Sequence, residues 1–199
     1  MTKKLGIMVM ILGTVLITAA ALLLLYNHYE DQKAGEAAQA LVPEIKQTIN
    51  EGDTENETDI GKAQSSGMTA LEIDGYDYIG YLSIPTLNLE LPVMSEWDYS
   101  RLRIAPCRQY GSLWTNDLVI AGHNYSHHFG SLSALELGNA VAFTDMNGDT
   151  VDYSVKDVKT LQPTDADWVE HSGFDLILYT CTYSGKTRIV VCCNRLEKK

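Results

Sequence analysis

Basic residues are scarce in this chain of 199 residues. Lysine and arginine number 15 against 26 aspartates and glutamates, so the net charge is −11. Nucleic-acid affinity rests largely on Lys and Arg side chains that neutralise phosphates, so we expect no nucleic-acid partner. Cysteine and proline are also scarce, at 4 and 5 residues. These counts exclude a disulfide-dense miniprotein and a collagen, and 45% apolar residues exclude a wholly disordered chain.

Residues 5–26 form a long hydrophobic run of 22 residues without a charge. As a helix rising about 1.5 Å per residue, the run is roughly 33 Å long, enough to cross the hydrocarbon core of a membrane. Lys3 and Lys4 precede the run, and Glu30 and Asp31 follow it. The positive-inside rule therefore predicts a single-pass protein of the cell membrane, with residues 1–4 as a cytoplasmic tip and the body outside.

A cleaved signal peptide is the alternative interpretation of this run. Such a peptide has a shorter apolar region that ends at small residues. Here four leucines at 22–25 extend the run beyond the three alanines at 19–21. An uncleaved transmembrane signal anchor over residues 5–26 is therefore favoured.

Residues 27–70 are predicted to form an extracellular stalk or linker, because they hold nine acidic residues and three lysines. Residues 30–50 have helical composition, and we expect Pro43 to interrupt that helix. Residues 51–67 are acidic, polar and nearly free of large apolar side chains, so we expect them to be flexible. The partial apolar stripe of the helical part consists of Ala37, Ala40, Leu41, Ile45 and Ile49.

Residues 71–199 are long enough for one domain, and their patterns are mostly those of strands. Residues 87–93 alternate apolar and polar side chains, with Pro92 indicating an edge or a strand end. Residues 141–143 and 151–155 are expected to pair across a turn at Asn147-Gly148. Helices are expected to be few and short. The candidates are 96–103, 130–137 and 164–170, the last with Thr164 as N-cap.

Many strands, glycine-containing turns and the lack of alternating long helices predict an all-β fold, a closed barrel of the antiparallel type. The four cysteines of an exported protein allow two disulfides in three pairings. Cys192 and Cys193 are adjacent in a strand, so they point to opposite faces and one of them is expected to face the core. Cys107 is interpreted as a free or partly buried thiol. The sequence has no CxxC pair, and no histidine lies at zinc-finger spacing from a cysteine, so a structural zinc site is not expected.

Cys181 stands out by its place at the end of an apolar strand, 175–181. Arg188 begins the next strand seven residues later, so a hairpin would bring the two close together. A guanidinium there favours a thiolate and stabilises an oxyanion. On position alone, a catalytic thiol and a core cysteine are equally good interpretations.

His123 is a second polar residue at the end of an apolar strand, 118–123, and it follows Gly122. Strand ends that carry Cys181 and His123 can open into one cleft, although spacing alone does not show that they meet. Of the other histidines, His28 lies next to the membrane run and His171 lies in a polar turn. His127 and His128 belong to a Ser/His-rich loop, where we expect surface residues.

Five segments form a recognisable set in this order: 78–85 (YIGYLSIP), 119–124 (VIAGHN), 129–132 (FGSL), 161–165 (LQPTD) and 178–183 (LYTCTY), the last with Arg188 downstream. Together they resemble the sortase family, and the similarity covers about residues 76–199. Sortases are membrane-anchored cysteine transpeptidases of the Gram-positive cell surface with an eight-stranded barrel. The resemblance implies an enzyme that cuts a C-terminal sorting signal resembling LPxTG and joins the acyl part to an amine.

The resemblance assigns Cys181 as nucleophile, His123 as catalytic histidine and Arg188 as catalytic arginine. Thr180 is expected to help position substrate. It further implies secreted proteins with a sorting signal as substrates and a peptidoglycan precursor or a pilin amine as acceptor. Some sortases use calcium, and the body has 17 acidic residues, but no cofactor or metal ligand is assigned.

Other arginines do not match the motif. Arg195 lies at the opposite end of the strand that Arg188 begins and has the opposite side-chain parity. Arg101, Arg103 and Arg108 precede the His123 strand and match no part of the pattern.

The subclass indicated is a housekeeping or class B/D-like anchoring enzyme. The sequence ends in RLEKK without a second hydrophobic segment, which departs from many pilin-polymerising sortases. No aromatic lid motif precedes the barrel, and the loop between Thr160 and Phe174 is too short for a long inserted helix.

Two other function classes compete with this interpretation. An L,D-transpeptidase, or another cell-wall peptidase with Cys and His, would be expected to show a Gly-Cys-x-Arg-like motif, whereas Thr180 precedes Cys181 here. A non-catalytic surface-binding domain on a stalk needs no reactive thiol. Trapping Cys181 with an alkylating substrate mimic separates that class from an enzyme.

Overall fold

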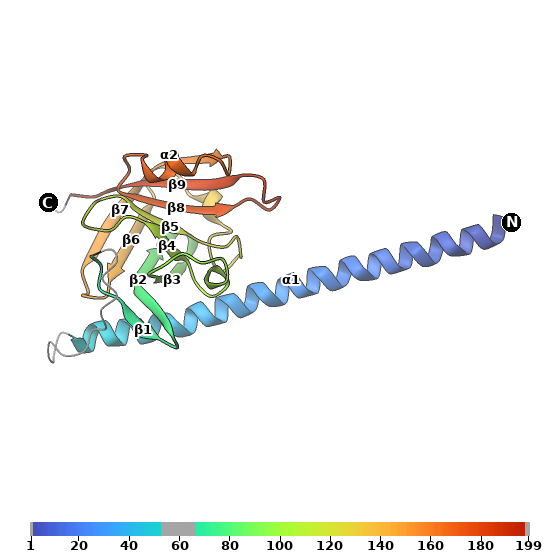
Figure 1. Cartoon of the computed structure of the whole chain (residues 1–199), viewed down its shortest axis with the longest axis horizontal. Coiled ribbons are helices and arrows are strands. Elements are labelled where there is room, and N and C mark those ends of the chain that lie inside the picture. The colour runs from blue at the N-terminus through green and yellow to red at the C-terminus, as the bar shows by residue number, and fades with distance from the viewer. Residues whose placement is uncertain (1, 53–66, 198–199) are drawn as a thin grey trace. The chain divides into compact units, whose positions relative to one another are not determined.

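The structure is a computed structural model that describes residues 2–52 and 67–197. The chain divides into two compact units, Met1–Lys33 and Ala34–Lys199. The first unit is the start of helix α1 (Thr2–Gly52; Figure 1). The large apolar side chains of its first part, from Leu5 to Tyr29, are exposed. Within the described residues, α1 is the one helix long and apolar enough to cross a membrane, over Lys4–Asn50. This is compatible with the predicted membrane anchor.

The later part of α1, from Ala34 onward, belongs to the second unit. Its buried side chains recur every three or four residues, the spacing of one helix face: Ala34, Ala38, Val42 and Ile45. The expectation that Pro43 interrupts the helix is wrong, because α1 continues through it. Packing of this face offsets the backbone hydrogen bond that proline cannot donate. The expected flexibility at 51–67 concerns mainly residues outside the described ranges.

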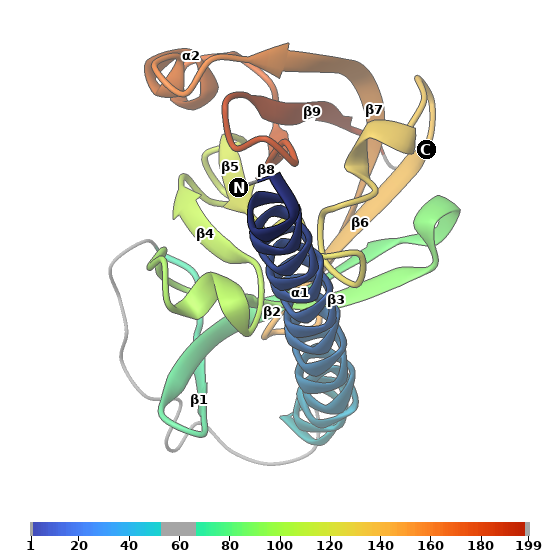
Figure 2. The ribbon, with the colours of Figure 1, turned by 90° about the vertical axis from the view of Figure 1, so that its right-hand side faces the viewer.

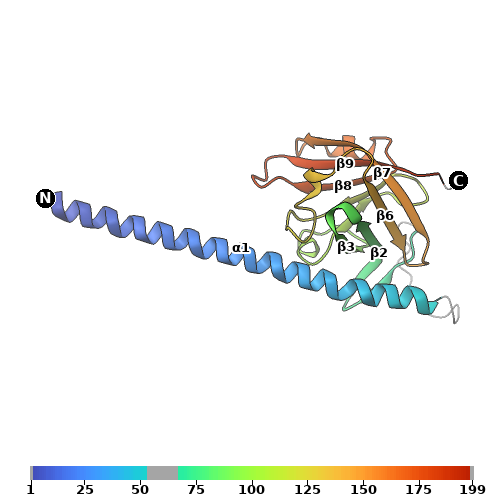
Figure 3. The same ribbon diagram turned by 180° about the vertical axis from the view of Figure 1, so that it is seen from behind.

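The body is a closed barrel of eight strands, as predicted. Strands follow one another around the ring in the order β2-β3-β4-β5-β8-β9-β7-β6, and β6 pairs with β2 to close it. Figure 3 shows this closure, with β6 between β7 and β2. A ninth strand, β1, pairs antiparallel with the first three residues of β2, 76–78 (Figure 2). The strands are β1 (Leu71–Ile73), β2 (Tyr76–Ile84), β3 (Leu89–Met94), β4 (Cys107–Tyr110), β5 (Leu118–Ala121), β6 (Ala140–Asp145), β7 (Thr150–Leu161), β8 (Leu176–Cys181) and β9 (Arg188–Arg195).

The strand pairings confirm the predicted hairpin of β6 and β7 and correct the expectation of a purely antiparallel barrel. Phe143 on β6 is paired with Val151 on β7, and Gly148 takes a φ of 83° in the turn between them. Pro92 lies in β3, and β4 pairs with β3 only at Met94. On that side of the strand Pro92 therefore has no partner to which it would need to donate a backbone hydrogen bond. The barrel is not purely antiparallel, because β3–β4 and β5–β8 are parallel.

Helices in the body are shorter than expected. Within the predicted 96–103 and 130–137, only the 3-10 turns Arg101–Arg103 and Leu132–Ala134 form. The third candidate forms as α2 (Ala166–Glu170), with Asp165 rather than Thr164 at the N-cap position. Val169 and Trp168 of this helix pack on the outer face of β8 and β9. Figure 1 shows α2 lying over β9.

The strands alternate between the barrel interior and an outer face, and this alternation orients the site. On β8, Leu176 and Leu178 belong to the interior core, whereas Ile177 and Tyr179 pack outside. Cys193 faces the interior core and Cys192 faces the outer cluster, which confirms that one of the pair faces the core, and both are buried. All four cysteines are free, and the two disulfides that the count allows do not form.

Candidate active site

Two neighbouring parallel strands bring His123 and Cys181 to the same edge of the barrel. In the β5–β8 pair, Ala121 lies opposite Tyr179, and the Gly122 amide donates to the Tyr179 carbonyl at 3.0 Å. His123 and Cys181 each follow that pair by two residues. The strand register therefore places both residues at one edge of the barrel, which the sequence spacing left open.

Cys181 and Arg188 lie directly opposite each other in the antiparallel β8–β9 pair. Cys181 has the parity of the outward-facing Tyr179, and Arg188 has that of the outward-facing Val190. The Arg188 Nη1 donates to the carbonyls of Gly185 and Thr187, both at 3.1 Å. These two bonds hold the guanidinium beside the loop that follows Cys181.

Cys181 differs from the other three cysteines in its exposure. It is half-buried, whereas Cys107, Cys192 and Cys193 are fully buried. Burial raises the pKa of Cys107 to about 12, of Cys192 to about 11 and of Cys193 to about 12. These three thiols stay protonated at neutral pH and are packed as small apolar side chains.

Thr180 is 2% exposed and has the parity of the interior residue Leu178. Its hydroxyl oxygen is buried and has no hydrogen-bond partner in the described part of the chain. The hydroxyl therefore points away from the face that carries Cys181, and only the Thr180 backbone is near that face.

A hollow of about 150 Å³ opens on the outer face beside Arg188. Its floor holds Tyr179, whose hydroxyl donates a hydrogen bond to the Gln109 side-chain oxygen. Burial raises the pKa of Tyr179 to about 12, so the phenol remains a neutral donor. The other lining residues are Leu161, Gln162, Pro163, Asp165, Val169 and Val190. The 161–165 motif thus forms one wall of the hollow next to the candidate catalytic arginine.

The remaining histidines take different places. His128 is fully buried, so the expectation of a surface residue is wrong for it. His127 is exposed in the same loop. His171 is exposed and lies 3.9 Å from an Asp167 carboxylate oxygen, and His28 is exposed on α1. Only His123 joins Cys181 at the barrel edge.

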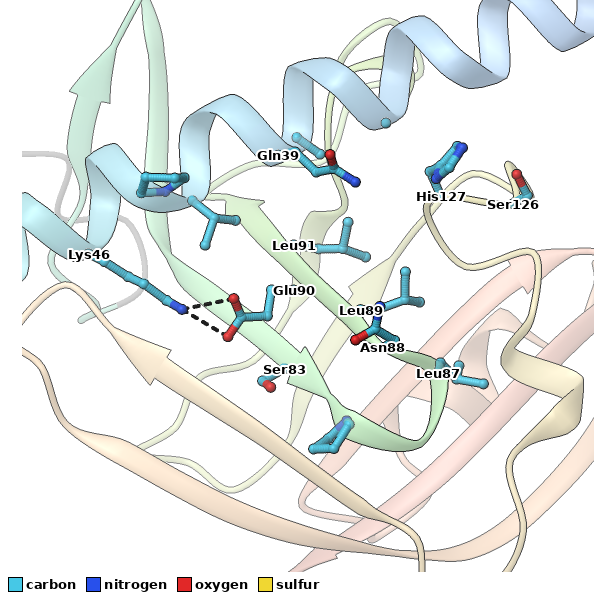
Figure 4. A pocket seen from close by; sticks show the side chains of 15 residues that line it. Gln39, Lys46, Ser83, Leu87, Asn88, Leu89, Glu90, Leu91, Ser126 and His127 are labelled. Carbon is cyan, nitrogen blue, oxygen red and sulfur yellow. Dashed lines mark hydrogen bonds and ion pairs between the residues drawn. The ribbon is translucent and has the colours of Figure 1, made fainter.

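A larger groove of about 790 Å³ lies between α1 and β3 (Figure 4). Lys46 on α1 donates both of its hydrogen bonds to Glu90 on β3, at 2.8 Å each. The loop after His123 forms one end of the groove through Ser126 and His127. The helix from Ala34 onward therefore borders the loop that carries the candidate catalytic histidine.

The family model for the sortase domain matches residues 82–196. The chain belongs to the sortase family. Sortase A of Bacillus anthracis is 25% identical over 162 residues, covering 78% of this chain and 77% of that protein. The family membership makes the protein a cysteine transpeptidase and excludes the L,D-transpeptidase and binding-domain alternatives.

Solved sortases share the fold. A Clostridium perfringens sortase D5 transpeptidase aligns with a TM-score of 0.62 at 17% identity, over 81% of this sortase and 99% of that chain. Sortase A from Corynebacterium diphtheriae aligns with a TM-score of 0.55 at 23% identity. That alignment covers 62% of this sortase and 63% of the Corynebacterium chain.

Of the four arginines outside the motif, three contact the framework of this sortase, and Arg103 is exposed. Arg195 donates through Nη2 to the Leu113 carbonyl at 3.0 Å, at the far end of β9 from Arg188. Arg108 donates to the Ser95 and Gly111 carbonyls. Arg101 pairs loosely with Glu96 at 3.7 Å, and Arg103 ends the same 3-10 turn. Across residues 2–52 and 67–197, no group of three or more His, Cys, Asp or Glu is arranged to hold a metal ion.

Three side chains near the site were not singled out by the sequence. Tyr179 and Gln109 line the hollow beside Arg188, and Tyr125 stacks on His123. The parity of Tyr179 with Cys181 along one strand is a signal that places it on the same face. Gln109 and Tyr125 reach the site through pairing and loop shape, which no local pattern reveals.

Proposed function

We propose that this sortase cleaves an LPxTG-like sorting signal at the C-terminus of secreted proteins. The acyl group passes through a Cys181 thioester to an amine of the cell wall or of a pilin. One observation carries the assignment of roles. Cys181 and Arg188 are register partners on the outer face, and His123 follows the strand that runs parallel to that of Cys181.

In the first step, the Cys181 thiolate attacks the carbonyl carbon between the Thr and Gly of the signal. Arg188 hydrogen-bonds the developing oxyanion or the adjacent substrate backbone. Protonated His123 donates its proton to the leaving glycine amine as the C–N bond breaks. The products are a thioacyl enzyme, a free C-terminal fragment and neutral His123.

In the second step, an acceptor amine attacks the thioester carbonyl. Neutral His123 takes a proton from that amine, and the C–S bond breaks to return the Cys181 thiolate. Water in place of the amine releases the free acid, so the same site acts as a cysteine protease when no acceptor is present. Transfer and hydrolysis thus share one intermediate.

The hollow beside Arg188 is the proposed place for the acyl side of the signal. It has apolar walls at Leu161, Pro163 and Val190 and polar groups at its floor. Thr180 is proposed to help position the bound peptide through its backbone, because its hydroxyl is buried on the interior side. No cofactor is part of this proposal, and calcium dependence is left to the assay.

The proposed setting is the outer side of a Gram-positive cell membrane. Residues 5–26 would span the bilayer, with residues 1–4 in the cytoplasm and the catalytic domain, predicted over 71–199, outside. Of the predicted stalk at 27–70, the helix from Ala34 onward packs with the barrel in one compact unit, so the connection to the membrane helix is short. Exported substrates and lipid-linked wall precursors meet at this surface, and tethering raises their effective concentration near the enzyme. Wall anchoring by a housekeeping or class B/D-like enzyme is proposed in preference to pilus assembly.

A peptide-library assay on residues 34–199 tests the proposal, because that range is one compact unit. LPxTG-like peptides are mixed with an amine, and mass spectrometry follows the acyl adduct on the protein. We expect cleavage after Thr, a thioester on Cys181, and loss of both in Cys181→Ala. Cys107→Ala is the matched control, because that thiol is fully buried. Retained activity in Cys181→Ala, or loss only in Cys107→Ala, would assign the chemistry to another residue.

A further inference from the structure

Tyr125 lies flat against the ring of His123. Their ring centroids are 4.4 Å apart and the planes are inclined by only 11°, a stacked arrangement. Tyr99 is the other aromatic ring measured against His123, and it is tilted by 58° with its centroid 6.2 Å away. Close parallel contact with the imidazole is therefore made by Tyr125.

The loop backbone fixes the place of Tyr125. The Tyr125 carbonyl accepts hydrogen bonds from the amides of His128 at 3.0 Å and Gly130 at 2.9 Å. The Phe129 amide donates to the His123 carbonyl at 3.0 Å. A Cβ on Gly130 would lie 2.7 Å from the Tyr125 carbonyl oxygen, so only glycine permits this closure.

The loop is also anchored below. Phe129 is fully buried in the barrel core, and a Cβ on Gly122 would lie 2.4 Å from its ring. His128 is fully buried as well, and its ring lies 5.6 Å from that of Tyr125. The loop is thus anchored in the core at Gly122 before Tyr125 and at His128 and Phe129 after it.

We infer that Tyr125 is a positioning residue for His123, an inference that rests on the proposed function. The terminal torsion of a histidine is broad and nearly two-fold, so the backbone alone does not fix its ring plane. The His123 Nδ1 lies 3.3 Å from the Asn124 side-chain oxygen, and the stacked Tyr125 ring holds the imidazole plane. With Nδ1 engaged there, the stack aims Nε2 at the leaving and entering amines. Aromatic pairs of this kind contribute enough to change a rate about 3- to 10-fold when orientation limits the step.

Three variants of the 34–199 protein test this role in the acylation assay. Tyr125→Leu removes the aromatic face and is expected to lower kcat about 3- to 10-fold with KM unchanged. Tyr125→Phe keeps the face and is expected to restore most of the kcat. Tyr99→Leu, the matched control on the tilted and exposed ring, is expected to keep both parameters. An unchanged kcat in Tyr125→Leu, or a Phe variant as slow as the Leu variant, would overturn the inference.

A second measurement does not depend on activity. The Tyr125 ring shields the His123 imidazole, so the Cε1–H NMR signal of His123 should lie upfield and move downfield in Tyr125→Leu. The signal should stay in place in Tyr125→Phe, and His123→Gln assigns it. A signal that does not move in Tyr125→Leu refutes the stack. If the wild type is inactive but its His123 signal lies upfield as expected, the result counts against the proposed function and leaves the stack in place.

Discussion

Cys181 and Arg188 are paired residues at the last position of β8 and the first position of β9. The register of an antiparallel ladder, rather than the conformation of a loop, sets how the thiol and the guanidinium face each other. Both strands also pack into the core through alternate residues, so this register is held by the interior of the barrel.

Arg188→Ala is expected to lower kcat/KM about 100- to 1,000-fold, because an oxyanion donor at this position acts mainly in the transition state. Arg188→Lys keeps the charge but loses the planar fork, so it should recover only part of the activity. Steady-state kinetics of peptide cleavage measure both effects.

Arg195→Ala is the matched control on the same strand. Its guanidinium serves the Leu113 carbonyl at the other end of β9, so it should lower stability by about 1 kcal/mol and leave kcat/KM unchanged. A large loss of kcat/KM in Arg195→Ala, together with an active Arg188→Ala, would reverse the assignment of the two arginines.

Thiol labelling should be selective for Cys181. Iodoacetamide on the native protein at pH 8 is expected to add one carbamidomethyl group, at Cys181. The other three thiols are buried, with pKa values raised to about 11 or 12. Four groups should be added after unfolding in urea. Peptide mapping by mass spectrometry locates the adducts, and early labelling at Cys107 would contradict the packing described for it.

The sequence predicted the barrel and the paired strand ends well, because both depend on short-range patterns. Alternating apolar residues, the Asn147-Gly148 turn and the seven-residue spacing of Cys181 and Arg188 are local signals. The family resemblance of the motifs around His123 supplied the assignment of roles, which spacing alone did not.

Other features depend on long-range packing and have no local signal. The parallel β5–β8 pair that joins His123 to Cys181 links strands more than 50 residues apart. His128 is buried, and α1 continues through Pro43, because of packing against residues far away in the sequence. The packing of the helix from Ala34 onward likewise requires a partner surface that its own sequence does not reveal.

Ile45→Ala should destabilise the 34–199 protein by about 2–4 kcal/mol, because the side chain is fully buried against Tyr78 and Met94. Urea unfolding followed by tryptophan fluorescence gives the change in free energy. Gln39→Ala, an exposed position on the same helix, should change it by less than about 0.5 kcal/mol. Equal effects of the two variants would mean that this part of α1 does not pack on the barrel in solution.

Gly35→Ala on the same helix sets two effects against each other. Alanine favours a helix by about 1 kcal/mol over glycine, but its Cβ would lie 2.6 Å from the His127 Cγ and 2.8 Å from the His127 Cβ. We expect Gly35→Ala to lower the free energy of unfolding in the wild-type background and to raise it in the His127→Gly background. Urea unfolding of the four proteins of this double-mutant cycle measures the coupling, and additive effects would contradict the contact.

Asp145 should make stability depend on pH in an unusual direction. Its carboxylate accepts the amides of Asn147 at 2.9 Å and Asp149 at 3.0 Å through Oδ1, but burial outweighs these bonds and raises its pKa. The folded state therefore keeps the proton to a higher pH than the unfolded state, and the free energy of unfolding falls as pH rises between the two pKa values. Asp145→Asn keeps an Oδ1 acceptor and has no proton to lose. The stability of the wild type relative to Asp145→Asn, from urea midpoints measured upward from about pH 3.5, should decline through that window and then level off. A relative stability that rises with pH would mean that the hydrogen bonds outweigh burial.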